Sequence, residues 1–179
     1  DTAFRNQTQE QILALAAAAS TTFNSVHMEG FDAMSDTQIQ AFEAFIDYAH
    51  SQGTTVILVL SPWHPFLYNY LLNETDLHKG FFQVEPWIRQ YCAENNIPLY
   101  GSYDPECIEG IEEMDFFDGL HCKDTGIKKF FPGVPAVLEA VQNNTLPDPL
   151  ATTPRTSLPT AADAAAAKTT GETADADAA

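Results

Sequence analysis

The sequence predicts an α/β fold with three layers (αβα), in which helices cover both faces of a parallel sheet. Segments with helical periodicity alternate along the chain with short apolar runs rich in β-branched residues. The apolar runs lack the alternation of a strand with one wet face, which is typical of parallel strands covered on both sides. A chain of 179 residues, 45% of them hydrophobic, can also bury the core of one such domain.

Helical signals open the chain. Thr8 and Gln11 have the spacing of a capping box, and so do Ser35 and Gln38. Apolar residues follow each pair at helical spacing, so we expect a helix after each pair. Gly53 stands where a left-handed residue would end the second helix.

Two apolar runs predict the strands. Residues 54–60 are rich in Thr, Val and Ile, and residues 97–100 form a shorter run that contains Pro98. A third strand is expected near residues 25–28. Because sheets usually contain about five or six strands, we expect the remaining strands of the sheet upstream of this chain.

Three helices complete the predicted fold. One covers residues 82–95 and has Pro86 in its first turn, which separates the two clear strands. Another begins near Asp124, and the last covers residues 134–141. This order of helices and strands favours parallel pairing, because parallel strands need a crossover connection.

The composition changes near residue 147. Residues 151–179 contain 11 Ala and 7 Thr, and no aromatic residue, Ile, Val or Met. Such a stretch buries too little apolar surface to offset the entropy of ordering it. The chain is therefore predicted to comprise a folded part, residues 1–146, and a disordered acidic tail, residues 147–179.

The charge of the chain limits its partners. Asp and Glu number 25 against 8 Lys and Arg, a net charge of −17. This balance argues against electrostatic binding to nucleic acid or to an anionic membrane.

No apolar run approaches the roughly 20 residues that span a bilayer. Three Cys are too few for a dense disulfide scaffold, although a Cys92–Cys107 bridge stays open, as does the oligomeric state.

The strongest local signal is Asp118-Gly119-Leu120-His121, in the loop after the second strand. Ligands of open α/β sheets bind at the carboxyl ends of the strands. An Asp three residues before a His can hold one imidazole nitrogen and fix the tautomer, which leaves the other nitrogen as a general base. The alternative is a loop His beside a capping Asp. The aromatic residues before the pair and the helix after it favour a catalytic role for Asp118 and His121.

The run from Phe117 to His121, followed by a helix that contains Gly126, resembles the last block of the SGNH/GDSL hydrolase superfamily. The resemblance covers residues 20–143 and includes the order of helices and strands. It implies a flavodoxin-like domain in which Asp118 and His121 complete a catalytic triad with a serine. More narrowly, the chain is similar to bacterial SGNH-like proteins of cell-surface polysaccharide pathways. That similarity implies a small-molecule or carbohydrate ester as substrate, hydrolysis or acyl transfer, and an extracytoplasmic location.

Two blocks of that family do not occur in this chain. One is Gly-Asp-Ser, which carries the family's nucleophile, and the other is Gly-x-Asn-Asp, which supplies an oxyanion-hole Asn. The simplest explanation is that both lie upstream of Asp1. Because triad members act as a unit, we expect little or no hydrolase activity from this chain alone. The alternative is a non-catalytic SGNH-like binding or assembly module.

Trp63 and His64 follow the first strand and are expected near the same rim as His121. As substrate-binding residues, Trp63 would stack on a sugar face and His64 would hydrogen-bond a leaving group. The alternative is a rigid turn between prolines, with a packed Trp and a surface His.

A metal site is not expected. Asp118, His121 and Cys122 lack the paired short spacings that zinc ligands usually have. No cofactor is expected either. The acidic residues between positions 104 and 115 are expected to form a solvated loop.

Overall fold

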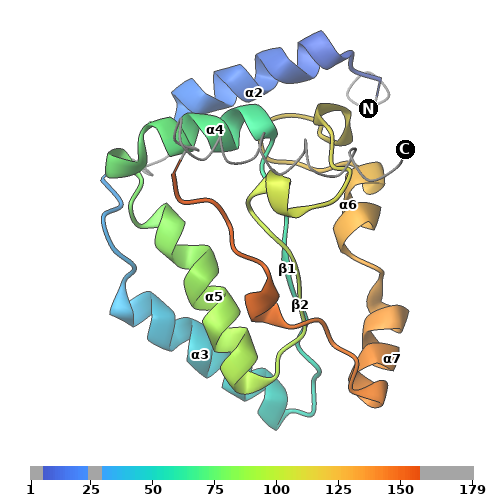
Figure 1. The fold of residues 1–179 in the computed structure, drawn as a ribbon. Helices are drawn as coiled ribbons and strands as arrows, with labels where there is room; N and C mark the ends of the chain where they lie inside the picture. Colours follow the sequence, from blue (N-terminus) through green and yellow to red (C-terminus); the bar gives the residue numbers. More distant parts are fainter. Residues whose placement is uncertain (1–5, 24–29, 158–179) are drawn as a thin grey trace, which may run out of the picture.

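The computed structural model describes residues 6–23 and 30–157 (Figure 1). The helices and strands, in chain order, are α2 (Gln9–Phe23), α3 (Asp36–Ser51), β1 (Leu58–Leu60), α4 (Pro65–Asn73), α5 (Phe81–Asn95), β2 (Leu99–Gly101), α6 (Asp124–Phe130) and α7 (Val134–Asn143). Single 3-10 turns lie between them, namely η2 (Thr75–Leu77), η3 (Pro105–Cys107), η4 (Glu113–Asp115) and η5 (Pro149–Ala151).

Strands β1 and β2 pair in parallel, with Leu58 opposite Leu99 and Leu60 opposite Gly101. The mixed α/β character that the sequence predicts is thereby confirmed. Figure 1 shows α3 and α5 on one side of the strand pair and α7 on the other. The carboxyl ends of both strands face the end of the molecule where α2 and α4 lie.

Strand β1 is shorter than the predicted run of residues 54–60. Leu58 N–H donates to the C=O of Pro98 over 2.9 Å. Pro98 has no N–H that could donate back to the residues before Leu58, so the ladder cannot extend toward the amino ends of the strands. Val59 is 42% exposed. The expectation that both faces of this strand are covered is therefore wrong at Val59.

The core between the strands and their helices is a cluster contributed by four elements and one residue of the connection between α5 and β2. Its buried members are Ile46 of α3, Leu60 of β1, Cys92 of α5, Ile97, and Leu99 of β2. Phe42 and Ile88 pack against this cluster. Burial of these side chains fixes α3 and α5 against the sheet.

Helix α4 is an element that the sequence analysis missed. Pro65, one of the two prolines of the rigid-turn alternative, occupies the first turn of this helix, where its missing N–H costs nothing. The preceding His64 caps the helix, because its Nδ1 accepts the N–H of Phe66 over 3.1 Å. Leu67 and Leu71, one turn apart, are fully buried and fix the helix against the domain.

The two predicted capping boxes have different outcomes. Thr8 N–H donates to Gln11 Oε1 over 2.9 Å and Gln11 N–H donates to Thr8 Oγ1 over 3.3 Å, so the first box is confirmed. Ser35 caps α3 through its backbone and makes no side-chain capping bond. Gly53 has a φ of 74°, as its predicted position after α3 requires.

Helix α5 begins at Phe81, so Pro86 lies inside the helix and beyond the first turn that the sequence analysis predicted. Asn96 ends the helix in the left-handed region, with a φ of 53°. The side chains of Glu85 and Arg89 face the interior as a buried ion pair of 2.6 Å.

The boundary of the predicted tail needs correction. Residues 147–157 lie against the domain and include η5. Composition missed this because one ion pair, between Arg155 and the fully buried Asp104, anchors the segment. Residues 158–179 of the predicted tail, and the possible strand at residues 25–28, lie outside the described residues.

None of the helices in the described segments combines the length and the apolar character that a membrane crossing demands.

Candidate functional site

The loop that carries Asp118 and His121 is a short hairpin between β2 and α6. Phe116 and Cys122 form an antiparallel bridge at its base. Phe117 N–H donates to the C=O of His121 over 2.8 Å, which closes the loop. The backbone therefore brings the two predicted catalytic residues to one tip.

Asp118 and His121 are in direct contact. The Nδ1 atom of His121 lies 2.8 Å from Oδ2 and 3.0 Å from Oδ1 of Asp118. Oδ1 also accepts the backbone N–H of Leu120 over 2.7 Å and that of His121 over 2.9 Å. The carboxylate thus fixes the loop and the ring together, and it favours the tautomer in which Nδ1 carries the proton.

The electrostatics keep Asp118 ionised. Burial raises the pKa of this carboxyl, but the hydrogen bonds from Leu120 N–H and from the His121 ring and N–H outweigh it, and the pKa lies below its usual value. The His121 side chain is 69% exposed, so Nε2 can meet a substrate. The pair is arranged as a general base with its orienting carboxylate.

Gly119 explains why the loop can lie so close to two helices. A Cβ at this position would lie 2.9 Å from the Cβ of Ala19 in α2 and 3.0 Å from Cδ2 of Leu67 in α4. The small side chains of α2, among them Ala16, permit the same approach. Glycine is therefore required at the centre of this loop by packing.

His64 lies beneath the loop, not on the surface. Its side chain is fully buried, its ring packs edge-on against Phe116 at 5.2 Å, and its backbone N–H donates to the C=O of Gly119 over 3.0 Å. Burial lowers the pKa of His64, against the opposing effect of the Glu113 and Asp118 carboxylates. The ring is therefore neutral, with its proton on Nε2, because Nδ1 accepts the Phe66 N–H.

This position changes the interpretation of His64. The surface His of the alternative interpretation is wrong, and the ring of His64 is closed off from solvent. Within the described part of the chain, Nε2 of His64 has no hydrogen-bond partner. What His64 contributes here is the cap of α4 and the connection between the segment after β1 and the loop that carries Asp118 and His121.

Trp63 packs within the aromatic cluster beside α5. Its ring lies 4.4 Å from that of Phe81 and 6.4 Å from that of Tyr103, and the backbone N–H of Trp63 donates to the backbone C=O of Tyr103 over 3.0 Å. The side chain is half-buried. The packed Trp of the alternative interpretation describes this position.

Cys122 follows His121 and is a residue whose role the sequence left open. Its Sγ contacts the C=O of Pro62 at 3.8 Å, and burial raises its pKa to about 11 against the hydrogen bond with Ser61. A thiol with that pKa is protonated at neutral pH and is a poor nucleophile. Cys92, Cys107 and Cys122 are all free thiols, so the Cys92–Cys107 bridge does not form here.

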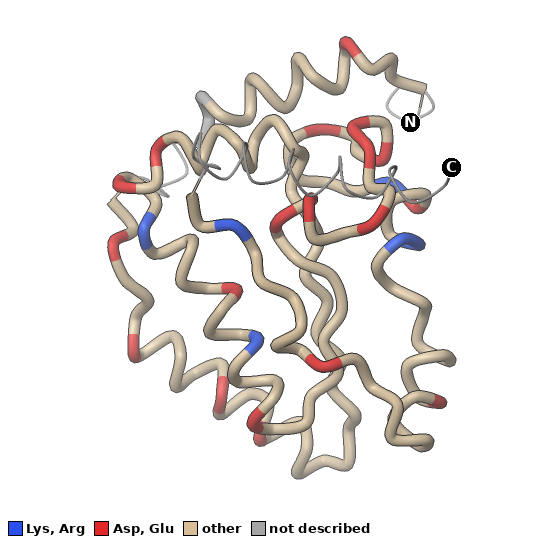
Figure 2. Tube along the Cα trace, viewed as in Figure 1, with Lys and Arg blue, Asp and Glu red and all other residues tan. Residues whose placement is uncertain are grey.

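Figure 2 marks the acidic positions along the chain before the loop. Glu106, Glu109 and Glu112 are exposed, as expected of a solvated loop, but two of the carboxylates are buried. Asp115 is buried and contacts Nζ of Lys129 at 2.6 Å. Its burial raises the pKa, but the hydrogen bonds from Lys129 and from the backbone of Glu112 bring it below the usual value. Asp104 is fully buried against Arg155. These carboxylates hold the loop in place and do not form a free anionic surface.

A nucleophile next to His121 is not evident. Ser20 and Ser102 are buried and donate to Ala17 C=O and to Glu85 Oε1, respectively. Among the residues that the structure describes, no serine hydrogen-bonds to the His121 ring, and no group of three or more His, Cys, Asp or Glu is arranged to hold a metal ion.

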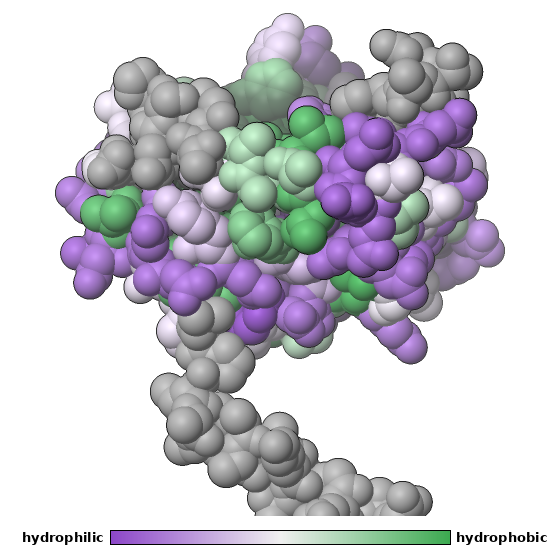
Figure 3. All heavy atoms as spheres, turned by 90° about the horizontal axis from the view of Figure 1, so that it is seen from above, coloured by the Kyte–Doolittle hydropathy of each residue, from purple (hydrophilic) through white to green (hydrophobic). Residues whose placement is uncertain are grey.

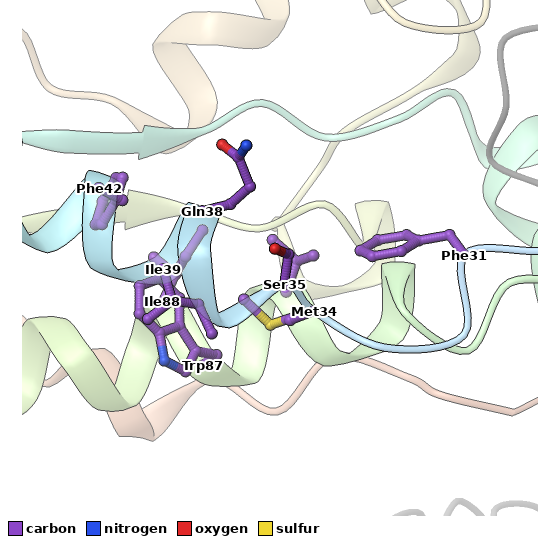
Figure 4. A pocket seen from close by; sticks show the side chains of 9 residues that line it. Phe31, Met34, Ser35, Gln38, Ile39, Phe42, Trp87 and Ile88 are labelled. Carbon is purple, nitrogen blue, oxygen red and sulfur yellow. The ribbon is translucent and has the colours of Figure 1, made fainter.

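A separate cavity of about 280 Å³ lies between α3 and α5 (Figure 4). Its lining is mainly apolar and includes Phe31, Met34, Ile39 and Trp87. None of the sequence-predicted site residues lines it. The cavity offers no acid or base, so it cannot supply the chemistry of the Asp118–His121 pair.

Figure 3 looks onto the end of the molecule that α2 and α4 form, where hydrophobic surface lies next to hydrophilic surface. Leu13 and Leu15 of α2 and Phe66 of α4 are partly exposed.

Comparison with known proteins finds no matching protein-family model, no matching curated protein and no matching solved structure.

Proposed function

We propose that this chain is the C-terminal part of an SGNH-type serine ester hydrolase or O-acyltransferase domain that acts on an acyl ester carried by a carbohydrate. The observation that carries the proposal is the 2.8 Å contact between His121 Nδ1 and Asp118 Oδ2. It lies in the loop after β2, where open α/β sheets bind their ligands.

The residues of the pair have distinct roles in this reaction. Nε2 of His121 takes the proton of a serine hydroxyl as that oxygen attacks the ester carbonyl, and later returns the proton to the leaving alcohol. Asp118 stays ionised, because its pKa is lowered, and it stabilises the imidazolium that forms. The same steps serve hydrolysis or acyl transfer, depending on whether water or another alcohol accepts the acyl group.

The serine would come from a further strand beside β1. In a parallel ladder the N–H and C=O of Val59 are directed away from β2, and its side chain is 42% exposed. Phe45 of α3 is 65% exposed and Val134 of α7 is 51% exposed, on the two sides of the strand pair. Open edges and large apolar surfaces are usually covered, which supports a wider, three-layer domain.

The test uses the longest natural product of the gene, defined by the DNA upstream of the Asp1 codon. We expect a Gly-Asp-Ser block there, labelling by a fluorophosphonate probe, and hydrolysis of an aryl acetate and of an acetylated oligosaccharide. His121→Ala should lower turnover by about 10²–10⁴-fold. His50→Ala, at an exposed position of α3, is the matched control and should leave turnover unchanged.

A non-catalytic module with the same fold is the second candidate. The observation that favours it is that no serine among the described residues hydrogen-bonds to the His121 ring. This candidate predicts no labelling by the fluorophosphonate. A natural product without a serine block, or ester hydrolysis that His121→Ala leaves intact, would overturn the catalytic proposal.

A further inference from the structure

Residues 147–157, the C-terminal strap, run along the face formed by α4, α5 and the loop after β2 (Figure 1). The strap contains η5, which packs on α5. It passes the carboxyl end of β2 and reaches α4 at Arg155. Its contacts differ in kind from those of the core.

The domain holds the strap through donors that reach its backbone. Three side chains donate to three strap carbonyls: Arg89 Nη1 to Pro149 over 2.9 Å, Cys107 Sγ to Thr153 over 3.6 Å, and Tyr68 Oη to Arg155 over 2.7 Å. Contacts of this kind do not depend on the strap's side chains. They are the contacts with which a protein surface binds an extended peptide.

One side chain of the strap is recognised specifically. The guanidinium of Arg155 places Nη2 2.6 Å from Oδ1 and Nε 2.8 Å from Oδ2 of Asp104. Its Nη1 lies 3.2 Å from Oδ1 of Asn69, and its Cζ lies 5.5 Å from the centre of the Tyr68 ring. This geometry suits a planar fork, which lysine cannot present.

Asp104 makes the subsite selective. Its carboxylate is fully buried, and Oδ2 also accepts the backbone N–H of Arg155 over 2.8 Å. A buried carboxylate that loses its cation is strongly unfavourable, so the site favours return of a guanidinium. The strap itself buries no side chain completely, and Leu150 is 50% exposed. Because no side chain of the strap is fully buried, its attachment depends strongly on these polar contacts, which is typical of segments that open locally.

We propose that the C-terminal strap is an intramolecular peptide ligand, and that the face of α4, α5 and the loop after β2 is a binding site for an extended peptide with one arginine. The chain's own residues 147–157 occupy this site, with Arg155 in the Asp104 subsite. The inference does not depend on the proposed ester chemistry, and its test measures no enzymatic activity.

The test is peptide binding to the full chain with its own arginine removed. The protein is the 179-residue Arg155→Ala variant, and the probe is a labelled, end-capped peptide of residues 147–157, followed by fluorescence anisotropy. We expect saturable binding. A peptide with Arg155→Lys should bind about tenfold more weakly, and one with Arg155→Ala about a hundredfold, because each lost charge-assisted hydrogen bond weakens binding about tenfold.

The unmodified chain provides the competition control. Its tethered strap has an effective concentration in the millimolar range, so the same peptide should bind it at least about tenfold more weakly than it binds the Arg155→Ala chain. Circular dichroism would check that the Arg155→Ala chain folds. If it does not, the Arg155→Lys chain keeps a cation near Asp104 and serves as the receptor.

Three results would overturn the proposal. The first is equal binding of the Arg, Lys and Ala peptides, and the second is equal binding to the variant and unmodified chains. The third is a dimer of the unmodified chain, seen by light scattering, that Arg155→Ala dissociates, because the strap would then lie on a second copy.

Discussion

The backbone N–H of His64 donates to the C=O of Gly119 over 3.0 Å, and this bond joins the segment after β1 to the loop that carries the Asp118–His121 pair. His64 also caps α4 with its ring, and Gly119 touches both α2 and α4. The position of the candidate base therefore depends on the packing of two helices that contribute no catalytic group.

Gly119→Ala should displace the loop that carries Asp118 and His121. The new Cβ would lie 2.9 Å from Ala19 and 3.0 Å from Leu67, and overpacking of this kind costs about 1–3 kcal/mol. We expect a lower melting temperature and a changed NMR signal of the His121 ring. Gly53→Ala is the control: it meets no neighbouring atom but carries the strain of a φ of 74°. It should lower stability and leave the His121 signal in place. An unchanged His121 signal in Gly119→Ala would contradict the packing argument.

Asp118→Asn should change the tautomer of His121 with little change in the loop. The Asn oxygen can still accept the N–H groups of Leu120 and His121, but the negative charge beside Nδ1 is lost. Long-range ¹⁵N–¹H spectra of the imidazole should move from the form protonated at Nδ1 toward a mixture of tautomers. A spectrum identical to that of the unmodified chain would show that Asp118 does not orient the ring.

His64 should make stability depend on pH. Burial lowers its pKa in the folded chain below the ordinary value of 6.5. At a pH between the lowered pKa and 6.5, the unfolded chain therefore binds more protons than the folded one. The contribution of the neutral ring is fully present above pH 6.5 and is lost as the pH falls toward the lowered pKa. Urea unfolding between pH 7.5 and pH 5 should therefore show a loss of stability that His64→Asn reduces.

Two variants of His64 separate the charge of its ring from its capping role. His64→Asn supplies a side-chain oxygen for the Phe66 N–H, whereas His64→Ala supplies none and should be less stable by about 0.5–2 kcal/mol at pH 7.5. Equal stability of the two variants would mean that the cap contributes nothing measurable.

The sequence could predict the features that depend on neighbours in the chain. The box of Thr8 and Gln11 and the pairing of Asp118 with His121 each act over three residues, and both form. Helix α4 is not evident from the sequence, because Pro65 suits a tight turn as well as the first turn of a helix, where it stands here.

Features that depend on distant contacts could not be predicted in this way. The strap is held by a pair 51 residues apart, Arg155 and Asp104, in a stretch whose composition alone indicates disorder. Burial of His64 involves contacts with Phe116 and Gly119, which are distant in the sequence, and no local pattern contains that information. The short β1 ladder likewise depends on Pro98 in the partner strand.

Glu85→Gln should be among the most destabilising single substitutions in the folded part. Oε1 of Glu85 accepts from Arg89 Nε, Arg89 Nη2 and Ser102 Oγ, and Oε2 accepts the Tyr103 N–H over 2.8 Å. Both members of the ion pair are buried, and loss of one charge leaves the other unpaired, which costs about 3–5 kcal/mol. Urea unfolding measures this loss. Gln90→Ala, which breaks the exposed contact with Glu94 on the same helix, is the matched control and should cost under about 0.5 kcal/mol.

Because Arg89 also donates to Gly101 and Pro149, release of the strap should accompany Glu85→Gln, with faster amide exchange at residues 150–157. Exchange at those residues that matches the Gln90→Ala control would show that the buried pair and the strap are independent.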